Sequence, residues 1–205
     1  MHKTRKGAIL MAKIHTVIKN TFLHFGKICK HKWWVFYYCC KAGIPWRGFM
    51  HDWSKLSPTE FWESVKYYQG NRSPIDACKE DKGYSKAWLH HKGRNTHHYE
   101  FFIDNLDNGG TALQMPFIDT LELICDYLGA ARAYLGKNFS FAKEWEWWLN
   151  KSAKPLLMHP QTKTFITLVL WHLQDNEPQF GKSVEYLLKK DNMRRYYNDA
   201  YIQKF

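Results

Sequence analysis

Helical periodicity is the feature that most constrains how this chain can fold. Residues 14–42 carry apolar side chains at three- and four-residue spacing, among them Ile14, Val17, Ile18 and Val35. That spacing places apolar groups on one face of an α-helix, whereas the strict alternation typical of half-buried strands is almost absent from the chain. The sequence therefore predicts an all-α fold.

Start and stop signals divide the chain into further helices. Proline disfavours helix in the residue before it, so Gly43-Ile44-Pro45 should end the first helix. Ser57-Pro58-Thr59-Glu60 reads as a capping box that starts a helix reaching about Gln69. Further helices are expected over 85–92, 96–105, 116–135, 140–150, 160–174 and from 183 onward, with a polar loop over 70–83.

These segments predict an all-α helical bundle of about seven or eight helices. A length of 205 residues suits one domain, so we expect a single all-helical domain over residues 1–205. Within it, about 25–135 should form the functional core, and 136–205 should pack on that core as a C-terminal helical extension.

Composition limits the classes of protein and of partner. The aromatic content of 17% argues against disorder, and no apolar run approaches the roughly 20 residues that cross a bilayer. We therefore expect no membrane partner. The net charge of +11 favours anionic partners such as nucleic acid, nucleotides or anionic lipid, although solubility alone explains the charge equally well. Five cysteines without a CxxC pair indicate reduced thiols and a cytoplasmic protein.

Histidines and carboxylates form the one pattern that points to chemistry. Six of the eleven histidines are His31, His51, His90, His91, His97 and His98, and His51 is followed directly by Asp52. On the helix expected over 116–135, Asp119, Glu122 and Asp126 share a face. Taken by themselves, those three carboxylates are better explained as a solvated acidic face. Imidazole nitrogen and carboxylate oxygen together, however, suit Zn, Mn, Fe, Ni or Co.

The order of these residues resembles the layout of HD phosphohydrolases, in which one His precedes an adjacent His-Asp, optional further His and a closing Asp. The resemblance implies an HD-domain-like helical bundle. The expected ligands of one or two divalent transition-metal ions are His31, His51, Asp52, His90, His97 and Asp126. Adjacent helical residues point about 100° apart, so only one member of each histidine pair should face an ion. His91, His98 and Glu122 remain as alternative ligands or as partners of a ligand.

Polar and basic residues beside these histidines are candidates for holding a phosphate. They are Ser54, Lys55, Lys92, Arg94 and Asn95, with Arg72 as a further candidate. An ordinary basic loop is the alternative. Catalytic roles are expected for Asp52, Lys55, Arg94 and Glu60, although Glu60 is first of all a capping-box residue.

Two His-rich stretches make the sequence similar to a known family. They read GFMHDWSKLSPTEF over 48–61 and GYSKAWLHHKGRNTHHYE over 83–100, and the segments 31–39, 70–76 and 115–126 extend the resemblance to about residues 25–175. The chain resembles bacterial and phage proteins catalogued as domain of unknown function 5662. Some members carry the label catalase, but nothing in this sequence resembles a haem pocket. The resemblance implies no activity, so the expected chemistry rests on the ligand order alone.

The ligand order favours a metal-dependent phosphohydrolase that acts on a nucleotide or phosphodiester with metal-activated water. Its partners would be a phosphate-containing small molecule or nucleic acid, and a homo-oligomer is left open. Three alternatives remain. They are a non-catalytic nucleic-acid-binding protein, a metal-dependent nuclease and a di-iron oxygenase.

Overall fold

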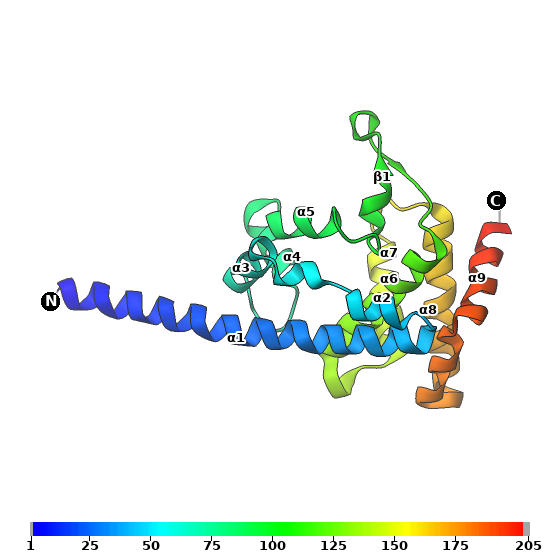
Figure 1. Cartoon of the computed structure of the whole chain (residues 1–205), viewed down its shortest axis with the longest axis horizontal. Coiled ribbons are helices and arrows are strands. Elements are labelled where there is room, and N and C mark those ends of the chain that lie inside the picture. The colour runs from blue at the N-terminus through cyan, green and yellow to red at the C-terminus, as the bar shows by residue number, and fades with distance from the viewer. Residues whose placement is uncertain (1, 203–205) are drawn as a thin grey trace. The chain divides into compact units, whose positions relative to one another are not determined.

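The computed structural model describes the backbone of residues 2–202 and the side chains of residues 11–200. Over that range it is a helical bundle, as predicted, with nine α-helices against the seven or eight expected (Figure 1). The helices are α1 (His2–Ala42), α2 (Pro45–Met50), α3 (Pro58–Lys66), α4 (Pro74–Lys82), α5 (Lys86–Lys92), α6 (Phe117–Leu135), α7 (Phe141–Ser152), α8 (Pro160–Phe180) and α9 (Lys190–Ile202). Two short antiparallel strands, β1 (Ile103–Asp104) and β2 (Thr111–Ala112), pair Ile103 with Ala112.

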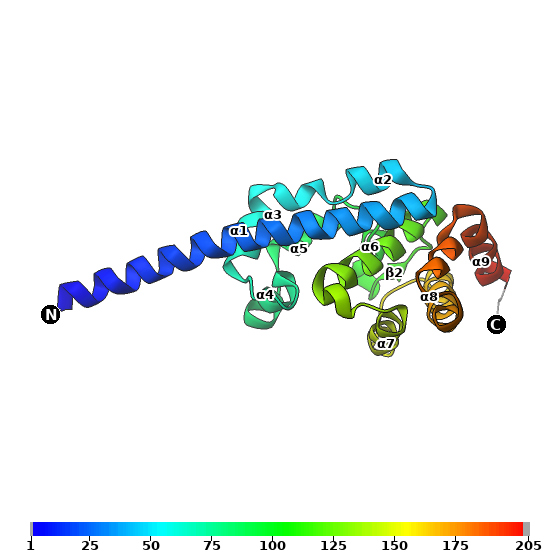
Figure 2. The ribbon, with the colours of Figure 1, turned by 90° about the horizontal axis from the view of Figure 1, so that it is seen from below.

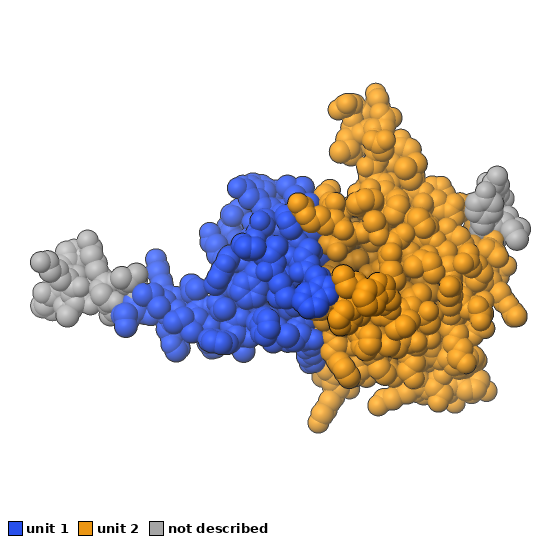
Figure 3. All heavy atoms as spheres, viewed as in Figure 1, with its two compact units in different colours: residues 1–30, 53–91 blue, residues 31–52, 92–205 orange. Residues whose placement is uncertain are grey.

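The chain forms two compact units, coloured separately in Figure 3. Unit 1 comprises residues 1–30 and 53–91, and unit 2 comprises residues 31–52 and 92–205. The helix α1 contributes its first part to unit 1 and its last part to unit 2. The expected C-terminal extension, α7 to α9, belongs to unit 2 together with α6. The single-domain expectation stays a prediction. Across residues 2–202, no helix combines the length and apolar composition of a bilayer span.

In unit 1, the first part of α1 packs on α3. The Asn20 side chain donates to the Val65 carbonyl at 3.4 Å, and the His24 ring lies 5.4 Å from the Phe61 ring between centroids. The helix α3 starts as predicted, because the Ser57 hydroxyl accepts the backbone N–H of Glu60 at 3.4 Å. The Glu60 side chain, however, does not complete a capping box and turns to two histidines instead.

Two local predictions are wrong. The expected polar loop over 70–83 contains α4, which begins with Pro74 after Ser73 and ends at Gly83 in the left-handed conformation. Proline at the first helical position and glycine just past the end are helix boundary signals, and they outweigh the polar composition. The expected helix over 96–105 is only a 3₁₀ turn at Tyr99–Phe102, followed by β1, because the backbone there pairs with β2.

The C-terminal helices also differ in extent from the prediction. The helix expected over 160–174 continues to Phe180, and its last turn accommodates Pro178. The helix expected from 183 onward begins only at Lys190, because Gly181–Leu188 forms a 3₁₀ helix first. The helices predicted over 116–135 and 140–150 are confirmed as α6 and α7 to within two residues.

The core of unit 2 surrounds α6. Residues 120–129 of this helix are all buried, and α7 and α9 each pack beside α8 (Figure 2). Leu121, Ile124 and Leu128 are completely inaccessible to solvent, as are Phe165 and Val169 of α8. A helix covered on every side normally carries apolar residues all round. This helix instead also buries two carboxylates, which need partners inside the protein.

Glycine lets two helices approach the last part of α1 closely. A Cβ at Gly129 of α6 would lie 2.5 Å from Val35 Cγ2 and 2.8 Å from the Val35 backbone nitrogen. A Cβ at Gly48 of α2 would lie 2.5 Å from Cys39 Cβ. One helical turn before Val35 stands His31, and three residues before Gly129 stands Asp126, so the close approach brings these two side chains together.

Candidate metal centre

Four side chains from three segments of unit 2 converge in its interior. They are His31 of α1, His51 and Asp52 after α2, and Asp126 of α6, and all four are buried. The His31 Nε2 atom lies 3.2 Å from Asp52 Oδ2 and 3.1 Å from Asp126 Oδ1. The His51 Nε2 atom lies 3.0 Å and 3.3 Å from the same two oxygens. The structure therefore brings together four of the six expected ligands at one point, and a fifth, His97, lies beside them.

These separations have the size that coordination to one ion demands. Ligand atoms bound about 2.1 Å from a tetrahedral or octahedral ion lie about 3.0 to 3.4 Å apart. The four ligand atoms, which lie within 4.8 Å of one another, could hold a metal ion. Two imidazole nitrogens and two carboxylate oxygens suit a first-row transition metal without any thiolate.

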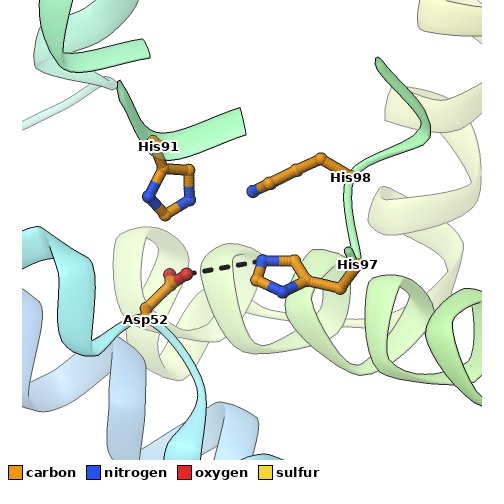
Figure 4. A group of neighbouring side chains, drawn as sticks. All are labelled: Asp52, His91, His97 and His98. Atoms are coloured by element: carbon orange, nitrogen blue, oxygen red, sulfur yellow. Dashed lines mark ion pairs between the residues drawn. The ribbon is translucent and has the colours of Figure 1, made fainter. Parts of the chain in front are cut away.

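Glu122 and His97 extend the centre. Glu122 Oε1 lies 2.9 Å from His51 Nδ1 and 3.3 Å from His97 Nδ1. On its other side, His97 Nε2 faces Asp52 Oδ1 at 3.4 Å, as Figure 4 shows. The His51 and His97 rings lie 4.3 Å apart between centroids, so two carboxylates bracket two adjacent rings. Glu122 thus occupies the place of a carboxylate that orients a metal-binding imidazole.

His98 lies beside His97 at the same end of the centre. The two ring centroids are 4.2 Å apart, and His98 is buried (Figure 4). Its ligand atom lies within 4.8 Å of ligand atoms of both Asp52 and His97. Asp52 could therefore contribute one oxygen to each of two ion positions.

Arg47 is a functional candidate that the sequence analysis missed. Its Nε donates to Glu122 Oε2 at 2.5 Å, and its Nη2 donates to Asp119 Oδ1. The Thr96 hydroxyl donates to the same Asp119 oxygen at 2.6 Å. Asp119 is therefore an anchor for Arg47. Only the position of Arg47 four residues before His51 could have indicated this role.

The buried carboxylates of the centre need positive charge to compensate them. Asp52, Glu122 and Asp126 bring three buried carboxylates together, and Arg47 offsets one of them. Burial lowers the pKa of His51, but Asp52 and its other acidic neighbours outweigh burial and raise that pKa well above its ordinary value. Uncompensated buried charge is costly, so the centre must take up either protons or a cation.

The carboxylates show the complementary effect. Burial raises the pKa of Asp126, but hydrogen bonds to His31 and His51 outweigh it and leave that pKa well below its ordinary value. In the same way, His51 and His97 overcome the burial of Glu122 and lower its pKa to about 2. Glu122 and Asp126 therefore stay ionised at neutral pH, which is the state that binds a cation.

The backbone at Asp52 is held in an unusual conformation. Its φ is +56°, in the left-handed region that side chains other than glycine rarely adopt. Aspartate tolerates this region better than most residues, but the conformation still has a cost that the surrounding structure must bear. Such outliers concentrate at functional sites. Here the conformation lets adjacent His51 and Asp52 point into the same centre.

His90 and His91 lie in unit 1, where Glu60 holds both of them. His90 Nδ1 lies 2.6 Å from Glu60 Oε1, and His91 Nδ1 lies 2.8 Å from Glu60 Oε2. Ser54 Oγ is 3.1 Å from the same His91 nitrogen, so these residues do not form a Ser–His–Glu triad, which needs both ring nitrogens. A carboxylate on Nδ1 is typical of imidazoles whose Nε2 binds a metal. Their role as ligands stays a prediction.

The expected phosphate-binding residues are spread over both units. Lys55 is half-buried in unit 1. Lys92 ends α5 and belongs to unit 2, as do Arg94 and Asn95 after it, and Arg94 is exposed. Arg72 is different, because both its terminal nitrogens donate to the Glu80 carboxylate, at 2.7 and 2.6 Å. This surface ion pair occupies the donors of Arg72, and its role in phosphate binding stays a prediction.

Fold and centre together define an all-α protein with a buried cluster of imidazoles and carboxylates that could hold a metal ion. The model of the family of unknown function DUF5662 matches residues 20–171, so the chain belongs to this family, as its sequence motifs predict. The matched range includes every residue of the centre. Comparison with curated proteins and with solved structures finds no match.

Proposed function

We propose that the protein is a metal-dependent phosphohydrolase acting on a nucleotide or phosphodiester. The observation that carries the proposal is the convergence of His31, His51, Asp52 and Asp126 at ligand–ligand distances in the interior of unit 2. Their order along the chain is that of the HD phosphohydrolases. The net charge of +11 supports an anionic substrate.

A divalent ion held by these four residues would polarise a phosphate oxygen and lower the pKa of a bound water. The protein's own contribution is to hold the ligands in place. Arg47 fixes Glu122, Glu122 orients His51 through Nδ1, and the opposite nitrogen of that ring faces Asp52 and Asp126. Arg94 and Lys55 remain the proposed donors to the phosphate.

Metal counting tests the centre. Purified protein should carry about one or two transition-metal ions per chain by elemental analysis, and His51→Ala or Asp126→Ala should lose them. His15→Ala is the matched control, because His15 is an exposed residue of α1 in unit 1. Loss of the metal from the control, or its retention in both centre variants, would contradict the assignment.

Hydrolysis tests the reaction. Manganese-loaded protein should cleave bis-p-nitrophenyl phosphate or members of a nucleotide panel, and a chelator should abolish the activity. A protein that binds metal but hydrolyses none of these substrates would support the metal centre and refute the phosphohydrolase.

Two measurements address the alternative functions. Chelator-insensitive binding to nucleic acid with steep salt dependence would favour the non-catalytic alternative. Visible absorption of iron-loaded protein would favour the di-iron oxygenase.

A further inference from the structure

A stripe of exposed apolar side chains runs along the first part of α1. It consists of Met11, Ile14, Ile18, Phe22 and Phe25, which are 68, 45, 52, 73 and 49% exposed. At 3.6 residues per turn, these positions fall on one face of the helix. We call them the α1 stripe. The opposite face is the one that packs on α3 through Asn20 and His24.

The beginning of this helix has little to support it within unit 1. All side chains of residues 11–19 are exposed, and Figures 1 and 2 both show the first part of α1 extending beyond the other helices of unit 1. β-Branched residues such as Ile14, Val17 and Ile18 have a lower helix propensity than straight-chain residues, so this part of the helix gains little stability from its own sequence. A contiguous exposed apolar surface of this kind marks an interaction site.

The charges around the stripe select the partner. Residues 1–51 contain no Asp or Glu, whereas Lys19 flanks the stripe and Lys13, Lys27 and Lys30 lie on the same helix. A second copy of the helix would bring like charges together. A nucleic acid would use the lysines but leave the apolar stripe in water. The surface of an anionic bilayer accommodates both features, because the acyl boundary takes the apolar face while lipid phosphates meet the lysines.

We propose that α1 binds the surface of an anionic phospholipid bilayer, with the α1 stripe turned toward the acyl chains. The helix would lie in the plane of the interface, and no segment need cross the membrane. This proposal is independent of the metal centre and departs from the expectation of no membrane partner. That expectation considered only the length of apolar runs, which says nothing about a helix with one apolar face.

Vesicle flotation of the full-length protein tests the proposal. At low salt the protein should float with vesicles of phosphatidylcholine and phosphatidylserine, and far less with pure phosphatidylcholine. Phe22→Ser/Phe25→Ser should reduce the bound fraction at least about tenfold, because the helix loses two aromatic side chains that would be buried in the bilayer interface. Leu106→Ser/Leu113→Ser is the matched control, since these residues are 72 and 54% exposed but lie outside α1. That control should bind as the wild type does.

A second variant separates charge from apolar contact. Lys19→Glu/Lys30→Glu keeps the stripe and should lose binding to the anionic vesicles, and circular dichroism should confirm that each variant remains helical. The proposal is overturned if the wild type does not float, if neutral vesicles bind it equally well, or if the stripe variant binds unchanged. It is also overturned if the stripe variant instead converts a dimer into a monomer in sedimentation.

Discussion

Arg47 holds the candidate metal-binding residues in position, although it does not contact His31, His51, Asp52 or Asp126 through any hydrogen bond or ion pair described above. It joins Glu122 and Asp119 through two different nitrogens, and only a planar guanidinium offers two donors in that fixed arrangement. The chain of contacts then runs through Glu122 to His51. Residues that orient a metal-binding imidazole in this way commonly affect metal affinity about as strongly as some ligands do.

Replacing this guanidinium should weaken metal binding without unfolding the protein. Arg47→Lys keeps the charge but cannot reach both carboxylates, so we expect a loss of about 10- to 100-fold in metal affinity, measured by competition with a chelating dye. Arg72→Lys is the matched control because Arg72 forms a comparable fork with Glu80 on an exposed surface. Equal affinity in both variants would rule out the positioning role.

Glu144 of α7 is a buried acid whose ionisation should make stability depend on pH. Burial raises its pKa to about 8, although Lys151 opposes the shift. The folded protein therefore binds this proton more tightly than the unfolded chain does. The contribution is favourable at low pH, and it is lost as pH rises from the ordinary value of 4.5 toward about 8.

Glu144→Gln removes this titration. The variant should be close to the wild type in stability near pH 4 and more stable at pH 8, by up to roughly 2 to 4 kcal/mol. Urea unfolding at several pH values measures the difference. Glu146→Gln, on the exposed side of the same helix, should show no such trend. A constant difference across the pH range would mean that Glu144 is not protonated in the folded state.

At the scale of elements, the centre depends on how closely α6 approaches α1. Gly129 permits an approach that any Cβ would obstruct, because the nearest atoms include backbone of Val35 rather than a movable side-chain end. His31 and Asp126 sit on either side of this contact. A displacement of one helix by even a fraction of an ångström would therefore change the separations on which coordination depends.

We expect Gly129→Ala to destabilise the protein by about 1 to 3 kcal/mol and to lower its metal content. Chemical denaturation and elemental analysis measure the two effects. Gly26→Ala provides the control, because Gly26 is also helical and its Cβ would meet nothing within 4 Å. That substitution should leave metal content unchanged and stabilise the helix by about 0.5 to 1 kcal/mol. Full metal content in Gly129→Ala would show that the close approach is not needed.

At the scale of the whole molecule, metal binding should stabilise unit 2 in particular. An ion at a thousand times its dissociation constant contributes about 4 kcal/mol, which raises the melting temperature of a chain this size by roughly 8 to 16 °C. Hydrogen exchange should show the added protection in residues 31–52 and in α6, because these supply His31, His51, Asp52 and Asp126. Added protection in α5 is expected only if His90 or His91 also binds an ion.

The success of the sequence predictions depended on how local each signal was. Ser57 and Pro58 start α3 as expected because capping needs only a few neighbouring residues. The helix α4 was missed because its interior is polar, although Ser73, Pro74 and Gly83 carried its boundary signals. Side-chain partners are not local at all. The sequence offered no reason to pair Arg47 with Glu122, which lies far along the chain.

What the sequence determined by itself is the helical fold, the family and the set of residues from which a metal centre can be built, because periodicity, motifs and residue chemistry are properties of the chain. Which of those residues meet was decided by tertiary structure. The close approach at Gly129 and the left-handed turn at Asp52 bring His31, His51 and Asp126 to one point. Ligand geometry is set to fractions of an ångström, and only packing between distant helices specifies positions that finely.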